Sequence, residues 1–291
     1  MNFSERLNDE QPILLDGAMG TLLHARGFKL PAPEWSAAML EAQPDIITGL
    51  HREYIDAGVE MITTVTFRTT TRVYSKLKKT DFPRDLNRRA VTCARAAIGD
   101  REDVFIAGSV APMEDCYRPD LVPAESDLRE EHREQIEWLV DAGVDVLLFE
   151  TMNSIREAAI CSEVARELGF PFFTSLVCRE PGILLSGESI SDAVAAISEH
   201  QPLGILVNCT APEILGETLE IVSAETDLPV GGYANVGFSE PEEGGTIEDV
   251  ISPEEYAGQV SGWLRYDPVL LGACCGSSPA HIAALRELID S

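Results

Sequence analysis

The chain has 291 residues, a length that fits either two domains of average size or one α/β barrel. It carries 22 Lys and Arg against 49 Asp and Glu, and the formal net charge of −27 makes nucleic acid an unsuitable partner because the phosphate backbone would be repelled. No stretch approaches the roughly 18 to 20 apolar residues that span a bilayer, and the polar, acidic N-terminus does not resemble a secretion signal. We therefore expect a cytoplasmic protein that does not enter the membrane.

Short apolar, β-branched runs alternate with segments of helical periodicity along the whole chain. The predicted strands cover residues 13–16, 61–67, 105–110, 146–150, 172–177, 204–208, 230–234 and 269–272. The predicted helices cover residues 45–57, 84–98, 127–142, 155–168, 190–199, 212–225, 253–264 and 279–289. Eight strand–helix units without a break in composition favour a single (β/α)8 TIM barrel over residues 1–291 rather than an open doubly wound sheet.

Three connections that follow predicted strands are unusually long, namely residues 22–44, 111–126 and 237–252. In a barrel, segments after a strand lie over the carboxyl-terminal mouth, where active sites are built. We therefore expect these connections to cover the functional site.

Cysteines follow two of the predicted strands at this mouth. Cys209 ends the sixth strand, and Cys274 and Cys275 follow the eighth. Because zinc prefers tetrahedral sulfur and nitrogen ligands, three thiolates predict a catalytic zinc site with one open position, for which a thiol is the natural fourth ligand. The adjacent pair requires the strand to end there, since side chains alternate along a strand, and Gly276 permits the turn.

Simpler interpretations stand beside the zinc site. Cys209 alone could be a small buried apolar residue, and the adjacent pair could be a coincidence or a strained vicinal disulfide. The seven cysteines are an odd number, which favours reduced thiols in a reducing compartment over a disulfide framework. The other four, Cys93, Cys116, Cys161 and Cys178, are interpreted as buried thiols unconnected to the mouth. The histidines are interpreted as surface or capping residues: His24, His51, His132, His200 and His281.

Several longer motifs appear along the chain in a fixed order. They are LLDGAMGT (14–21), PEWSA (33–37), DAGVEMITTVTF (56–67), AGSVAP (107–112), DVLLFET (145–151), VNCTAP (207–212) and GACCGSSPAHI (272–282). Through these motifs nearly the whole chain resembles the homocysteine S-methyltransferase family, the homocysteine-binding domain of betaine-, S-methylmethionine- and cobalamin-dependent enzymes that form methionine. The separated cysteine followed by Cys-Cys-Gly is the most specific part.

The resemblance implies a TIM barrel and a set of site residues. Cys209, Cys274 and Cys275 would bind zinc, with the homocysteine thiolate as fourth ligand and nucleophile, so that no protein residue acts as nucleophile. Asp16 and Glu150 match carboxylates that hold the amino group of homocysteine, and Gly17 lies in the same substrate motif. The alternative for both carboxylates is hydrogen bonding to loop amides at the barrel rim.

The sequence departs from the family pattern mainly after the third strand. Ala111 stands where many members have Gly, and residues 113–117 replace a glycine-rich stretch, which concerns the donor side of the pocket. The eighth-strand motif reads GACCGSS in place of GGCCGTT.

The methyl donor is expected to be a small onium compound, because no residues remain for a folate or cobalamin domain. S-methylmethionine and S-adenosylmethionine are favoured over betaine. Aromatic faces stabilise onium cations, and Trp35, Tyr117 and Tyr233 are candidates for donor binding, with ordinary packing as the alternative for each.

Two other functions remain as alternatives. The barrel could be a zinc module that binds homocysteine or another thiol and needs a separate corrinoid protein to supply the methyl group. A zinc-free aldolase would need a strand-end Schiff-base lysine, and the four lysines lie in predicted loops or helices.

Overall fold

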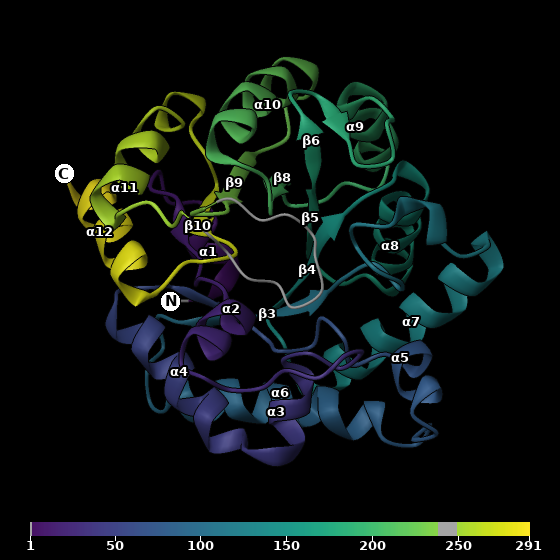
Figure 1. The fold of residues 1–291 in the computed structure, drawn as a ribbon. Helices are drawn as coiled ribbons and strands as arrows, with labels where there is room; N and C mark the ends of the chain where they lie inside the picture. The colour runs from purple at the N-terminus through teal and green to yellow at the C-terminus, as the bar shows by residue number, and fades with distance from the viewer. Residues whose placement is uncertain (1, 238–248) are drawn as a thin grey trace.

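The computed structural model describes residues 2–237 and 249–291, and in this part of the chain eight parallel strands form a closed barrel (Figure 1). The barrel strands are β1 (Ile13–Leu14), β2 (Met61–Thr63), β3 (Phe105–Val110), β4 (Val146–Met152), β5 (Phe172–Leu176), β8 (Ile205–Asn208), β9 (Val230–Ala234) and β10 (Leu270–Ala273). They pair in the order β1-β10-β9-β8-β5-β4-β3-β2, and a parallel bridge between Leu15 and Met61 joins the two ends. The predicted TIM barrel is confirmed.

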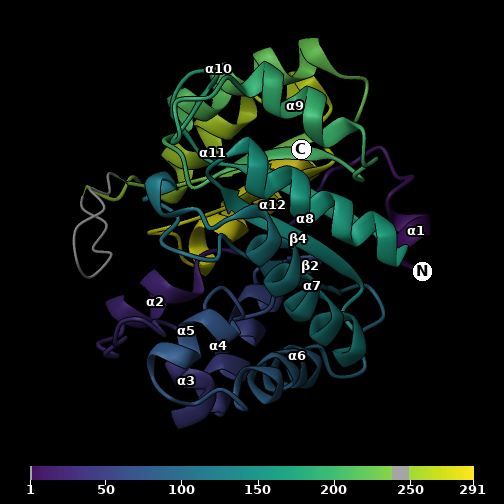
Figure 2. The ribbon, with the colours of Figure 1, turned by 90° about the vertical axis from the view of Figure 1, so that its right-hand side faces the viewer.

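Most of the helices surround the strands as an outer ring in Figure 1, whereas α1 and α2 lie at the two ends of the barrel (Figure 2). The helices are α1 (Phe3–Arg6), α2 (Met19–Ala25), α3 (Ala37–Ala42), α4 (Pro44–Asp56), α5 (Thr71–Lys76), α6 (Pro83–Ile98), α7 (Glu125–Ala142), α8 (Ile155–Leu168), α9 (Ile190–Ser198), α10 (Pro212–Glu225), α11 (Pro253–Ser261) and α12 (Pro279–Asp290). Each of the predicted helices is present, with its ends shifted by at most three residues. Within the described ranges, no helix combines the length and the apolar character needed to span a membrane.

Local sequence explains why these helices pack on the barrel. In α6, Pro83 occupies the first turn, where a backbone N–H has no partner within the helix and is therefore not needed. The helix ends at Gly99, which has a φ of +62°. Leu86, Ala90 and Ala94 recur at helical spacing and are buried against the strands. The apolar stripe therefore faces the barrel.

The strands bury both of their faces. Ile13 and Leu15 point into the barrel interior, whereas Leu14 between them packs in the layer under the helices, as expected from alternating side chains. This double burial explains why the strands read as short continuous apolar runs.

The second strand is shorter than predicted. It ends at Thr63 rather than at residue 67, because the chain turns there: the Thr66 N–H donates to the Thr64 carbonyl oxygen at 2.8 Å instead of to a neighbouring strand. The Thr64 and Thr66 hydroxyl groups lie 2.7 Å apart, and the Thr66 hydroxyl donates to the carbonyl oxygen of Ser109 at 2.6 Å.

The long connections also contain structure that the sequence pattern did not indicate. A hairpin of β6 (Cys178–Glu180) and β7 (Ile183–Leu184) follows β5, with Gly182 at a φ of +73° in its turn. The expected connection at 22–44 contains α3, and the one at 111–126 contains a 3₁₀ turn at Pro119–Leu121. Most of the expected connection at 237–252 lies outside the described residues.

The end of the barrel opposite the mouth is closed by the N-terminal segment. Figure 2 shows α1 and α2 at opposite ends of the barrel. Phe3 and Leu7 pack against the interior apolar cluster, and the Phe3 ring meets Phe105 edge to face, with 5.2 Å between the ring centroids. Arg6 is buried there and donates to the Glu60 carboxylate at 2.6 and 3.0 Å.

We expect the Arg6–Glu60 pair to be important for stability. Replacing Glu60→Gln removes the charge that compensates a guanidinium with only 5% of its side chain exposed, and should lower the free energy of unfolding by about 2 kcal/mol. Chemical denaturation measures this loss. Asp141→Asn is the matched control, since its pair with Arg84 is 65% and 67% exposed and should contribute at most about 0.5 kcal/mol. Equal losses in the two variants would contradict the prediction.

Candidate functional site

Three cysteine side chains meet at the mouth of the barrel. The Sγ atoms of Cys209, Cys274 and Cys275 all lie within 4.8 Å of one another, and those of Cys209 and Cys275 are 3.9 Å apart. Sulfur ligands about 2.3 Å from a tetrahedral zinc ion are about 3.8 Å apart from one another. All three are free thiols, so the vicinal disulfide is not formed. This donor set fits a metal ion that takes sulfur ligands.

The backbone at the ends of β8 and β10 turns these thiols toward one another. Cys209 follows β8 directly with a φ of +51°, a left-handed conformation that is costly for a residue with a Cβ and is held here by a hydrogen bond from its N–H to the Tyr233 carbonyl oxygen at 3.3 Å. β10 ends at Ala273, as the adjacent cysteine pair requires. Gly276 then turns the chain with a φ of +85°, and its N–H donates to the Thr21 hydroxyl at 2.9 Å.

The cluster favours one ionised sulfur. The thiols of Cys274 and Cys275 donate toward Cys209 and hold its pKa well below the ordinary value, while the pKa values of Cys274 and Cys275 are raised by the proximity of Cys209. Asn235, a residue that the sequence pattern did not single out, accepts a hydrogen bond on its side-chain oxygen from the Cys275 N–H at 3.1 Å. Asn235 therefore fixes the backbone of the adjacent pair.

Two carboxylates, the buried Asp16 and the partly buried Glu150, lie near the cysteines. Burial raises the pKa of Glu150 to about 7; the Ser109 hydroxyl, which donates to its Oε1, opposes this shift, and the charge of Cys209 adds to it. Asp16 is 2% exposed, and burial raises its pKa well above the ordinary value, with a further contribution from the charge of Glu150. Asp16 accepts hydrogen bonds from the N–H and hydroxyl of Thr63 at 2.9 and 3.0 Å, so the amide bonding considered as its alternative role is present. A bound cation would relieve the cost of ionising both groups.

A buried amide holds the end of β4 that carries Glu150. Thr151 has a φ of +58°, and its N–H and hydroxyl bond to the side chain of Asn208, each at 2.9 Å. The Ser175 hydroxyl donates to the same Asn208 oxygen at 2.8 Å. Asn208 thus joins the ends of three strands. The signal in the sequence is an Asn at the end of an apolar strand, directly before Cys209.

The remaining predicted substrate residues are placed differently from one another. Gly17 packs so closely that a Cβ there would lie 2.4 Å from the Ser277 Oγ. The Trp35 ring lies against α2, where a Cβ on Gly20 would be 3.3 Å from the ring. Tyr233 is 2% exposed and belongs to the apolar cluster inside the barrel, and its hydroxyl has no hydrogen-bond partner in the described chain.

Tyr117 reaches the cysteine cluster directly. Its hydroxyl lies 3.3 Å from the Cys209 Sγ. Cys116 and Cys178 were both interpreted as unconnected to the mouth, and this is wrong for both. Burial raises the pKa of the Cys116 thiol and the charge of the nearby Cys209 adds to the shift, while Cys178 lines the cavity beside Cys209. The reason is that a non-periodic loop carries Cys116, so strand and helix spacing could not place it.

The histidines were expected on the surface or in helix caps, and this expectation is wrong for His51 and His132. His24 is exposed, and His281 takes part in the capping box of α12 with Ser278. His51 and His132 are fully buried instead of lying on the surface. His132 pairs with the buried Glu157 at 2.8 Å, and burial lowers the pKa of His51 to about 4.

A cavity of about 370 Å³ opens beside Cys209. Tyr117, Leu185 and Ile251 supply aromatic and apolar walls, and Glu213 and Asp249 supply carboxylates. No Lys, Arg or His belongs to the lining among the described residues. The cavity therefore suits an uncharged or cationic ligand.

A TIM barrel whose mouth holds three thiols and two carboxylates with raised pKa values defines an enzyme that can bind a metal ion and a small cationic substrate. The family model described as homocysteine S-methyltransferase matches residues 13–289. Homocysteine S-methyltransferase 4 of Zea mays is 28% identical, over 95% of this chain and 89% of its own, and selenocysteine Se-methyltransferase of Brassica oleracea is 26% identical, over 96% and 89%. The crystal structure of the homocysteine methyltransferase MmuM from Escherichia coli in its metallated form is 28% identical, covers 97% of both chains and has a TM-score of 0.83. The chain belongs to the homocysteine S-methyltransferase family and is an enzyme of this activity.

The shifted thiol pKa values predict an order of reactivity in the metal-stripped protein. Cys209 and Cys93 are similarly buried, at 8% and 5% exposure, but the pKa of Cys93 is raised by burial whereas that of Cys209 is lowered. Iodoacetamide should therefore modify Cys209 at least about tenfold faster than Cys93 at pH 7, because the thiolate is the reactive form. The rate at Cys93 should rise with pH. Peptide mass spectrometry measures both rates, and similar rates at pH 7 would contradict the assignment.

Proposed function

We propose that this enzyme transfers a methyl group from a small onium donor to the thiolate of homocysteine, forming methionine, at a zinc ion held by Cys209, Cys274 and Cys275. The observation that carries the proposal is the group of three free thiols within 4.8 Å at the barrel mouth. When bound, zinc would supply a Lewis acid that lowers the pKa of the homocysteine thiol and leaves its sulfur nucleophilic.

The two carboxylates at the mouth support homocysteine as acceptor. An ammonium group between Glu150 and Asp16 would stabilise their ionised forms against the burial that raises both pKa values. We assign both residues, with the adjacent Gly17, to the amino-acid end of homocysteine. The Ser109 hydroxyl, which donates to Glu150, would orient the carboxylate.

The cavity beside Cys209 supports a cationic donor. Its lining includes Glu213 and Asp249 and an aromatic face from Tyr117, a combination that favours a sulfonium or quaternary ammonium group. Of the three aromatic residues proposed for donor binding, Tyr117 lines this cavity, whereas Trp35 and Tyr233 are not among its lining residues. We keep Trp35 and Tyr233 as proposed donor-binding residues beside Tyr117, and favour S-methylmethionine or S-adenosylmethionine over betaine.

Methyl transfer requires alignment of the thiolate with the donor methyl group and exclusion of water, and these matter more than acid–base catalysis. The thiolate sulfur forms a bond to the methyl carbon, the bond from that carbon to the donor sulfonium breaks, and its electron pair leaves the donor as a neutral thioether. No proton is transferred in this step. The protein's task is to hold the sulfur, carbon and leaving group in line.

The state of the cysteines supports a reducing compartment. All seven are free thiols, four of them outside the proposed zinc site. Reduced thiols in this number are typical of cytoplasmic proteins, and we propose that location.

A donor panel tests the proposal. Zinc-loaded protein, homocysteine and one methyl-labelled donor are incubated together, and labelled methionine is measured by mass spectrometry. S-methylmethionine should support turnover, S-adenosylmethionine less so, and Trp35→Ala should raise the KM of the donor more than that of homocysteine. Cys275→Ser should lose both zinc and turnover.

Two results would contradict the proposal. Full activity in Cys275→Ser would exclude the zinc site. Turnover that requires a methylated corrinoid protein, with none from any onium donor, would replace the proposal with the homocysteine-binding module.

The assigned role of Glu150 predicts a pH dependence. Methionine, which has no thiol to titrate, should bind more tightly as the pH rises through about 7, because the ionised Glu150 pairs with its ammonium group. Glu150→Gln should weaken binding about ten- to a hundredfold and abolish this step, without removing zinc. Ser109→Ala is the matched control: it removes a hydrogen bond that lowers the pKa of Glu150, so the step should move to higher pH. Calorimetric titration between pH 6 and 9 measures all three proteins, and unchanged affinity in Glu150→Gln would exclude the role.

A further inference from the structure

The loop after β3 is fixed to the helices on both sides of Glu114. The Met113 N–H donates to the Glu157 carboxylate at 2.8 Å, and this carboxylate is fully buried against His132. The carbonyl oxygen of Cys116 accepts a hydrogen bond from the Asn153 side chain at 2.9 Å. These contacts fix the backbone of the segment in which this chain departs from the family pattern.

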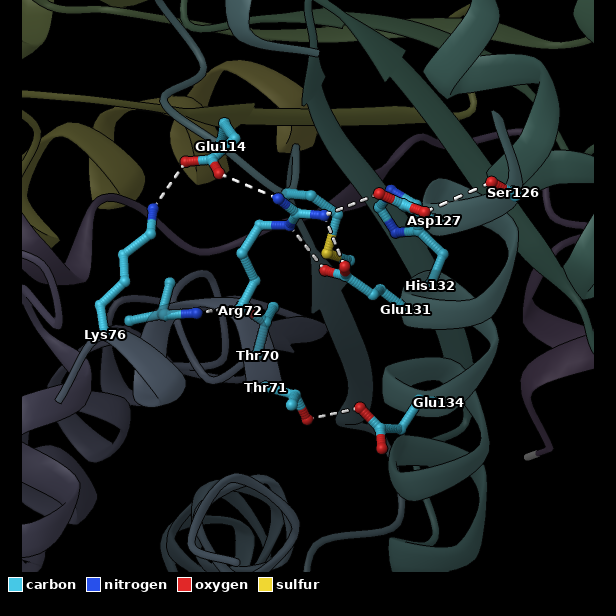
Figure 3. A network of polar contacts seen from close by, with 12 residues as sticks. Thr70, Thr71, Arg72, Lys76, Glu114, Ser126, Asp127, Glu131, His132 and Glu134 are labelled. Carbon is cyan, nitrogen blue, oxygen red and sulfur yellow. Dashed lines mark hydrogen bonds and ion pairs between the residues drawn. The ribbon is translucent and has the colours of Figure 1, made fainter. Parts of the chain in front are cut away.

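Glu114 itself is held by three cations of the segment 68–76, and Figure 3 shows two of them, Arg72 and Lys76. Arg72 donates to its Oε1 at 3.2 Å and Lys76 to its Oε2 at 2.8 Å. Arg68 donates to its backbone carbonyl oxygen at 2.7 Å. The side chain and the backbone carbonyl group of Glu114 are thus both bound by the same segment, which restrains the position and the orientation of Glu114.

The cation opposite Glu114 is itself fixed. Arg72 donates to both carboxylate oxygens of Glu131 on α7, at 2.6 and 2.8 Å, and lies 3.7 Å from the Asp127 carboxylate, as Figure 3 shows. The side chains of Arg72, Glu114 and Glu131 are only 21% to 23% exposed. Ion pairs of this geometry and burial are stronger than those of a freely exposed pair.

Three residues further along the chain, Tyr117 meets the cysteine cluster. Its N–H bonds to the Asp115 side chain at 3.0 Å, which makes a tight turn between Glu114 and Tyr117. The turn directs the phenol inward, so that its hydroxyl lies 3.3 Å from the Cys209 Sγ and its ring forms a wall of the 370 Å³ cavity.

We propose that Glu114 is a positioning residue for Tyr117: its ion pairs with Arg72 and Lys76 hold the loop so that the phenol donates to the Cys209 sulfur and its ring bounds the donor cavity. The inference rests on the proposed function in taking Cys209 as a metal ligand and the cavity as the donor site. A hydrogen bond to a ligand sulfur withdraws electron density from it and strengthens the metal as a Lewis acid. The ion pairs of Glu114 would therefore affect two properties through Tyr117: the Lewis acidity of the bound metal and the size of the donor site.

The test uses Co²⁺ as a spectroscopic substitute for zinc, without any substrate. Tyr117→Phe should shift the sulfur-to-cobalt absorption bands because it removes the hydrogen bond to Cys209. Glu114→Gln should shift them in the same direction, and the double variant should show no further shift, since both changes remove the same contact. Shifts that add in the double variant would overturn the proposal.

Two further variants separate positioning from general stability. Glu134→Gln alters a carboxylate at the same α5–α7 contact, where it accepts a hydrogen bond from Thr71 (Figure 3), and should leave the bands unchanged. Lys76→Gln removes one partner of Glu114 from a side chain that is 52% exposed, so the fold should survive and a smaller shift in the same direction should remain. Equal shifts in Glu134→Gln and Glu114→Gln would mean that the effect is only structural.

A second measurement needs no metal. Tetranitromethane should nitrate Tyr117 about fivefold faster in metal-free Glu114→Gln than in the unaltered protein, as expected when ion pairs that close a loop are lost. In turnover, Glu114→Gln should raise the KM of the donor about fivefold and leave that of homocysteine unchanged. Failure to bind cobalt would count against the proposed metal site alone, whereas an unchanged nitration rate would overturn the role of Glu114.

Discussion

Closure of the parallel sheet is the constraint on which the site depends. Cys209 and Cys275 are 66 residues apart in the sequence, and they meet because β8 and β10 both direct their carboxyl ends to the same mouth. The bridge between Leu15 and Met61 completes the ring and brings Asp16 to the same opening. Hydrogen bonds across the mouth then fix local geometry that the strands alone would not hold, including the left-handed backbone of Cys209 and Thr151.

Burial gives the acidic groups of this opening a different chemistry from those on the surface. The surface carboxylates pair with arginines or face water, and they supply most of the net charge of −27. Among the described residues no cation pairs with Glu150 or Asp16, and their pKa values are raised. A cationic ligand would therefore gain binding energy by pairing with these two carboxylates. The acidic groups of this chain thus have two roles: those on the surface favour solubility, and those at the mouth can select a substrate.

The sequence predicts much of this arrangement because the rules involved are local. Apolar runs bounded by Gly or Pro predict the strands, and parallel closure then requires Cys209 and Cys274 to share one edge. What the sequence could not predict depends on contacts between distant segments. His132 lies in a helix rich in charged residues, and its burial follows from pairing with Glu157 on the next helix. Glu114 and Cys116 belong to a loop without periodicity, and the short hairpin β6–β7 offers too few residues for an alternating pattern.

The closed floor of the barrel has a kinetic consequence. Phe3, Leu7 and Arg6 fill the end opposite the cysteines, so the mouth is the side from which reactants would reach the site. In the proposed arrangement the acceptor occupies the deeper position, against Asp16 and Glu150, and the donor lies nearer the opening beside Tyr117. A donor molecule bound near the opening would prevent the acceptor from entering or leaving its deeper position. If the two substrates bind in this arrangement, we infer that the acceptor enters first and that the demethylated donor departs before methionine.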